Sequence, residues 1–110
     1  MTEQDHIAAI AALNDACRAE PGAGWTLTQG VWALSEAEQR AALAAVTAFS
    51  DFSEDSDPHG ERDFGAFEVG ANKLFWKIDY YDLDLCRASP DPADPAVTRR
   101  VLTLMLAEEY

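Results

Sequence analysis

The sequence has few basic residues: eight lysines and arginines stand against 20 aspartates and glutamates, which gives a net charge of −12. Such a field repels nucleic-acid phosphates and anionic membrane surfaces, so direct binding of either is disfavoured. The same charge favours cations or a partner protein with a basic surface. A second interpretation is that the carboxylates only form a solvated, self-repelling surface.

The sequence also lacks cysteine pairs and long apolar runs. Its two cysteines, Cys17 and Cys86, lie far apart, which argues against a zinc framework or a disulfide scaffold. Residues 1–20 show no cationic start followed by an apolar run, and no stretch approaches the roughly 20 apolar residues of a membrane span. We therefore expect a cytoplasmic location and no membrane partner.

What the sequence does contain is enough apolar surface for one core. With 110 residues, of which 48% are hydrophobic, it fits a single globular domain over residues 1–110. Two domains would each be too small to bury a stable core.

The first half predicts two helices separated by a short strand. Thr2 and Asp5 form a capping-box pattern ahead of a helix that should stop before Pro21, and residues 25–28 alternate apolar and polar as a half-buried strand does. Ser35 and Glu38 form a second capping box, ahead of a helix that should run from about residue 36 to 49. Residues 31–34 fit either a strand extension or a turn.

An acidic loop and a hairpin follow. Residues 50–63 contain Pro58 and Gly60 and predict a loop, while residues 64–82 predict a β-hairpin. Pairing Val69 with Leu74 would place one alternating set of side chains in the core. The opposite face would carry apolar residues among its charges, so we expect a loop or a partner to cover it. Its members are Phe64, Glu68, Phe75, Lys77, Asp79 and Tyr81.

The last segment predicts a third helix. Asp94 at the N-cap position and Pro95 at the first helical position are a helix-start pattern, and Val97, Val101 and Leu104 have helical spacing. The predicted fold is therefore α+β, with about three antiparallel strands, three helices and the order α-β-α-β-β-α.

Two metal-binding patterns can be considered in the acidic loop. His59, Glu61 and Asp63 alternate along the chain, and Asp79 could join them from the hairpin to hold a divalent ion. This set would support a metal-dependent hydrolase or nuclease. A calcium-loop pattern starting at Asp55 lacks the required final acid. The alternative is an ordinary acidic loop; no catalytic set and no cofactor motif is evident.

Three segments together resemble one bacterial family, known only as domain of unknown function 3768. They are residues 57–65, residues 75–82, and the stretch from Ser89 to Tyr110; residues 13–15 and 28–31 fit as well. Members of this family usually carry His where this chain has Arg62, which weakens any metal role at that position. The resemblance implies a plasmid or other mobile-element setting near anti-restriction genes, and it implies no activity.

The leading hypothesis is a non-enzymatic protein that binds another protein. With the mobile-element resemblance, its specific form is a nucleic-acid-mimicking inhibitor of a host restriction or CRISPR nuclease. An accessory domain without activity is a further alternative, and the oligomeric state stays open. The predicted partner-binding residues are Asp55, Asp57, Glu61, Asp63, Asp79, Tyr81, Asp82 and Asp84.

Overall fold

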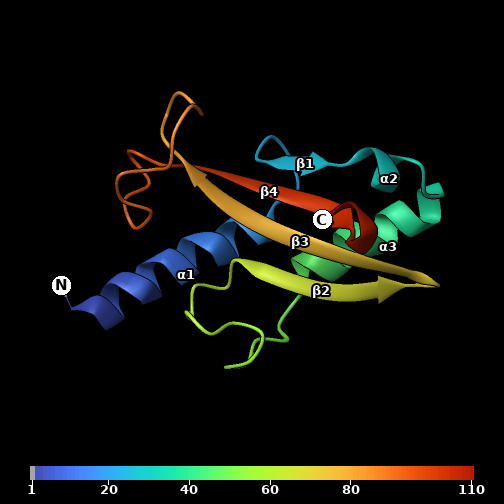
Figure 1. Cartoon of the computed structure of the whole chain (residues 1–110), viewed down its shortest axis with the longest axis horizontal. Coiled ribbons are helices and arrows are strands. Elements are labelled where there is room, and N and C mark those ends of the chain that lie inside the picture. Colours follow the sequence, from blue (N-terminus) through green and yellow to red (C-terminus); the bar gives the residue numbers. More distant parts are fainter. Residues whose placement is uncertain (1) are drawn as a thin grey trace.

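The computed structural model describes residues 2–110 and has an α+β architecture (Figure 1). Helix α1 (Glu3–Ala19) is followed by strand β1 (Trp25–Leu27), a single helical turn α2 (Gln29–Trp32) and helix α3 (Glu36–Thr47). Strands β2 (Phe64–Val69), β3 (Asn72–Tyr81) and β4 (Arg99–Leu106) come next, and a short 3-10 turn, η1 (Ala107–Glu109), ends the chain.

The two longer helices begin where the sequence predicts. Thr2 and Asp5 form the capping box of α1, and Ser35 and Glu38 form that of α3, each with side chain and backbone bonded in both directions. Residues 29–32 are helical rather than an extension of β1, and Val31 is fully buried there.

The strands form one four-stranded mixed sheet in the order β1-β4-β3-β2. Strand β1 runs parallel to β4, and the other neighbours are antiparallel. The predicted hairpin is present, but Phe67 rather than Val69 lies opposite Leu74. This two-residue shift keeps each side chain on its predicted face, because the side-chain period of a strand is two.

The predicted C-terminal helix is wrong, since residues 99–106 form the central strand β4. Strand β4 carries apolar side chains on both faces, so residues 101–106 form a nearly continuous apolar run, which also fits helical spacing over a short stretch. Asp91 and Asp94 accept backbone N–H groups two residues ahead, at Ala93 and Ala96, and so form turns instead of a helix cap.

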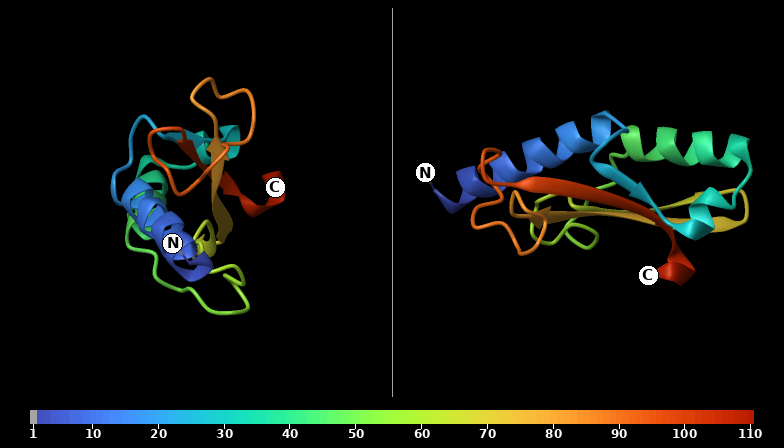
Figure 2. Two further views of the ribbon diagram at one scale, coloured as in Figure 1. Left: turned by 90° about the vertical axis from the view of Figure 1, so that its left-hand side faces the viewer. Right: turned by 90° about the horizontal axis from the view of Figure 1, so that it is seen from above.

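Both longer helices pack on one face of the sheet, whereas η1 folds back towards the other (Figure 2). The core lies between these layers. Its fully buried members come from α2, α3, β3 and β4: Val31, Ala42, Val46, Leu74, Trp76, Leu102 and Leu104. No helix within residues 2–110 is long and apolar enough to cross a membrane.

Candidate functional site

Four polar side chains from separate elements meet beside α1. The side-chain amide of Asn14, which is fully buried, donates to the Tyr80 hydroxyl at 2.8 Å and to the Glu61 backbone carbonyl at 2.9 Å. Its Oδ1 accepts from Nε of Arg100 at 2.7 Å, and the Tyr80 hydroxyl donates to Oε1 of Glu61 at 2.8 Å. We call Asn14, Glu61, Tyr80 and Arg100 the Asn14 network.

The electrostatics of this network favour a positioning role over proton transfer. Burial, together with the hydrogen bond to Glu61, raises the pKa of Tyr80 well above its ordinary value, so the hydroxyl stays protonated and donates. Burial lowers the pKa of Arg100, whose guanidinium lies 5.0 Å from the centre of the Tyr80 ring and also donates to the Pro92 carbonyl. The network therefore ties the acidic loop to α1, β3 and β4.

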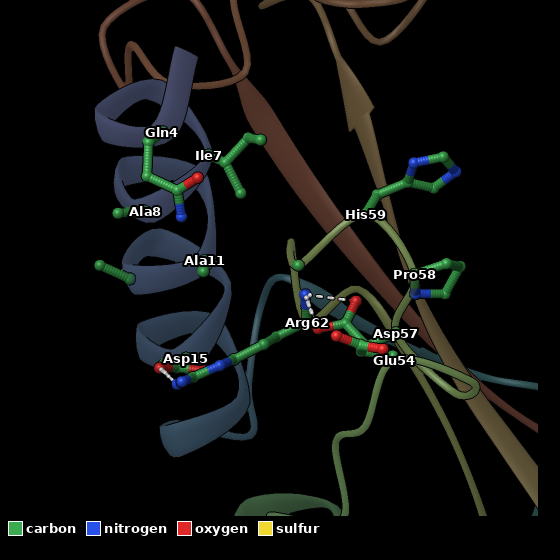
Figure 3. Close-up of a pocket in the computed structure, with 12 residues that line it drawn as sticks. Gln4, Ile7, Ala8, Ala11, Asp15, Glu54, Asp57, Pro58, His59 and Arg62 are labelled. Carbon is green, nitrogen blue, oxygen red and sulfur yellow. Dashed lines mark hydrogen bonds and ion pairs between the residues drawn. The ribbon is translucent and has the colours of Figure 1, made fainter. Parts of the chain in front are cut away.

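A cleft of about 680 Å³ lies between α1 and the acidic loop (Figure 3). Its floor on α1 is apolar, with Ile7 and Ala11, and its far end is closed by an ion pair of 2.7 Å between Arg62 and Asp15. Arg62 adopts a left-handed backbone with φ of 57°, and its N–H donates to the Asp57 carboxylate. The ion pair and the backbone bond together hold the loop against the helix.

A second arginine, Arg18, lies almost completely buried next to Asp15. The Arg18 guanidinium lies 5.1 Å from the Phe52 ring centre and 5.2 Å from that of Trp76, and it pairs with Asp15 at 2.9 Å. Asp15 thus binds both Arg18 and Arg62 and joins the core arginine to the loop.

The four predicted metal ligands do not converge. The His59 ring points away from α1 (Figure 3), and the Glu61 carboxylate accepts the Tyr80 hydroxyl. Asp63 lies just before β2, where burial and the nearby Glu61 charge raise the pKa of its carboxyl. Asp79 pairs with Lys77 at 3.0 Å on the face of the sheet away from the helices. In residues 2–110 no group of three or more His, Cys, Asp or Glu side chains could hold a metal ion.

The predicted partner-binding acids fall into two kinds. Asp55 and Asp84 are exposed, as the prediction requires. Others hold the chain in place: Asp57 accepts the Arg62 N–H, and Asp82 accepts the N–H of Cys86 at 3.0 Å in the turn after β3. Asp79 and Tyr81 lie on the other side of the sheet. The eight residues therefore do not form one continuous patch.

The sheet face away from α1 and α3, here called the open face, has its own chemistry. Phe64, Phe75 and Tyr110 form an aromatic cluster with ring centres 5.2 to 6.2 Å apart. The strand registers place three cations and two carboxylates on this face, a net charge of +1. Because the whole chain has a net charge of −12, the residues outside this face have a net charge of −13. The five charged residues are Lys73, Lys77, Arg99, Glu68 and Asp79.

Sequence reasoning did not single out Asn14, Arg18, Tyr80 and Arg100. One signal was available: Asn14 and Arg18 follow Ile10 at intervals of four residues, on the buried side of α1. A polar residue on an apolar helix face needs hydrogen-bond partners from elsewhere in the fold. The partners themselves lie up to 86 residues away, and no local pattern reveals them.

Comparison with known proteins gives the family. Residues 27–109 match the family described as protein of unknown function (DUF3768). The chain belongs to this family. The matched range includes Glu61, Tyr80 and Arg100 of the Asn14 network and the whole of the open face except Thr26 and Tyr110. No curated protein and no solved structure matches the chain.

Proposed function

We propose that this DUF3768 protein works without catalysis, by binding a partner protein that has a basic surface. The observation that carries the proposal is the separation of charge between the open face, at +1, and the rest of the chain, at −13. Complementary potentials steer a basic partner towards the negative side and disfavour acidic partners.

Fewer acids are available for such contacts than the sequence predicted. Asp51, Glu54 and Asp55 in the acidic loop and Asp84 in the turn after β3 are exposed. Within residues 2–110 their carboxylates make no intramolecular hydrogen bond or ion pair, so they lose no internal contact when they pair with lysines or arginines. Asp57, Glu61 and Asp82 support the loops that present them.

The specific form of the proposal is a nucleic-acid mimic that inhibits a nuclease of a host defence system. Exposed carboxylates on a rigidly held loop offer negative charge to a groove that normally binds phosphates. The mobile-element setting implied by the family resemblance fits this role. The held loop matters because ordering it on binding would otherwise cost conformational entropy.

Affinity capture tests the proposal. The wild-type protein and a variant with Asp51→Asn, Glu54→Gln, Asp55→Asn and Asp84→Asn are immobilised and exposed to a host lysate, with elution by salt and by duplex DNA. We expect the wild type to retain a basic nucleic-acid-binding protein that both eluents release, because screening weakens exposed charge pairs and DNA competes for the same groove. A control that neutralises two exposed acids at the ends of α1, Glu3→Gln with Glu20→Gln, should retain it.

Two results would contradict the proposal. One is a partner that the neutral variant retains as well as the wild type does. The other is a retained partner that duplex DNA cannot displace, which would leave protein binding standing but remove the nucleic-acid mimic.

A further inference from the structure

The strand side chains of the open face carry a net charge of +1 in a chain whose total is −12, and an aromatic cluster lies among them. Its aromatic cluster is continuous, since Phe75 lies 5.2 Å from Phe64 and 5.7 Å from Tyr110 between ring centres. Tyr110 is 76% exposed and therefore leaves most of one ring in solvent. Beside the cluster, Lys77 and Asp79 form a partly exposed ion pair.

We propose that the open face binds a second copy of this chain, so that the protein forms a two-fold symmetric dimer with its acidic surfaces outward. This inference is independent of the proposed partner, which would bind on the negative side.

Charge selects the second copy as the occupant. Two molecules of net charge −12 repel each other wherever their acidic surfaces meet. The open face, at +1, can approach its own copy without this repulsion at the contact. The mixed signs also make the face self-complementary, as a two-fold interface requires.

The strand geometry provides specific pairs. A two-fold axis that lies in the interface and crosses β3 at Ile78 would stack β3 on β3 in opposite directions. Lys77 would then face Asp79 of the second copy, and Phe75 would face Tyr81, because each pair is equally spaced about Ile78. Every contact occurs twice, so one substitution removes two contacts from the dimer.

The size of the face sets the strength of the expected dimer. Its four strands contain 27 residues, which cover a flat area of roughly 430 Å² at about 3.3 Å per residue and about 4.8 Å between strands. A standard interface buries about 800 Å² of accessible surface per partner. The accessible surface of the protruding side chains and of the η1 turn adds to this flat area. The face therefore suits a small interface and a reversible dimer.

Sedimentation velocity over a wide range of protein concentration tests the dimer. We expect a concentration-dependent shift from monomer to dimer in the wild type, and at least tenfold weaker dimerisation for Lys77→Asp, which puts like charges opposite each other twice. The double variant Lys77→Asp with Asp79→Lys should recover dimerisation, because the swapped charges again face their opposites.

A control separates this effect from a general change of charge. Arg40→Asp also reverses one cation that is paired with a carboxylate, Glu36, but on α3 at the other side of the molecule. It should leave dimerisation within about twofold of wild type. Thermal unfolding of each variant shows whether the monomer fold is intact, and Phe75→Ser gives a second, uncharged disruption of the face.

Salt gives an independent readout. Because added salt screens the repulsion between two −12 molecules, the dimer should persist as salt rises, whereas binding to a basic partner should weaken. The proposal is overturned if the wild type stays monomeric at every concentration, or if Lys77→Asp and Phe75→Ser both dimerise as the wild type does. A dimer that dissociates in high salt would also overturn it, since that would indicate copies held mainly by attraction between an acidic surface and a basic patch.

Discussion

The buried amide of Asn14 donates a hydrogen bond of 2.8 Å to the hydroxyl of Tyr80, a residue 66 positions further along the chain. This bond joins α1 to β3, and the same amide group reaches the backbone of Glu61 in the acidic loop. One side chain therefore positions a helix, the sheet and the segment that carries the proposed partner-binding acids.

Asn14→Ala should lower the free energy of unfolding by about 2–4 kcal/mol. The substitution leaves Nε of Arg100 without its acceptor and removes both bonds that the amide donates, and buried groups without partners retain their full desolvation cost. Urea unfolding followed by circular dichroism measures the change.

Two further variants give this prediction its controls. Tyr80→Phe removes only the hydroxyl. If the network acts as a unit, the double variant of Asn14→Ala with Tyr80→Phe should lose less stability than the two single variants lose together. Asn72→Ala removes a partly exposed bond to Glu38 and should cost under about 1 kcal/mol. Equal losses for Asn14→Ala and Asn72→Ala would contradict a special role for the network.

The elements that the sequence predicted well depend on neighbouring residues. Both capping boxes and the helices they begin are confirmed, because their signals lie within four residues of one another. The face assignment of β3 is confirmed too, with Leu74, Trp76 and Ile78 buried, since a strand's alternation is local.

The errors occur where distant parts of the chain decide. The sequence of residues 99–106 fits an amphipathic helix, yet these residues form an inner strand that pairs with β1 and β3. Neither pairing can be predicted from the neighbouring sequence. The candidate site shows the same limit. The sequence found the acidic loop, but it could not show that Asp57 and Glu61 bond within the fold while Asp55 stays exposed.

Gly65→Ala should destabilise the protein by about 2–3 kcal/mol. A Cβ at this position would lie 2.2 Å from Nε1 of Trp76 and 2.7 Å from Cζ of Phe49, both in rigid aromatic rings of the core. The rings would have to shift, and overpacking of this kind strains a core that is already closely packed. Thermal unfolding detects the change.

Gly22→Ala is the matched control, because nothing lies within 4 Å of the Cβ that it would add. It should change stability by under about 1 kcal/mol in either direction. If the two alanine variants unfold at the same temperature, the close approach of Trp76 to β2 is not the reason for a glycine at residue 65.

Asp63→Asn should stabilise the protein at neutral pH and have little effect near pH 3. Burial and the neighbouring Glu61 charge raise the pKa of the Asp63 carboxyl in the folded protein above its ordinary value of 3.8. The folded state therefore binds this proton more tightly than the unfolded state. The contribution of Asp63 to stability is complete below pH 3.8 and is lost as pH rises from there through the higher pKa of the folded protein. An amide cannot ionise and avoids this loss.

Urea unfolding of Asp63→Asn and wild type at a series of pH values measures the difference directly. The two stabilities should diverge as pH rises from below 3.8 and then stay apart by a constant amount once the folded carboxyl is ionised. Asp84→Asn, which removes one exposed carboxylate without a hydrogen bond, controls for the loss of a single charge from a −12 molecule. A stability gain that is the same at every pH, or that Asp84→Asn reproduces, would show that the environment of Asp63 does not disfavour its charge.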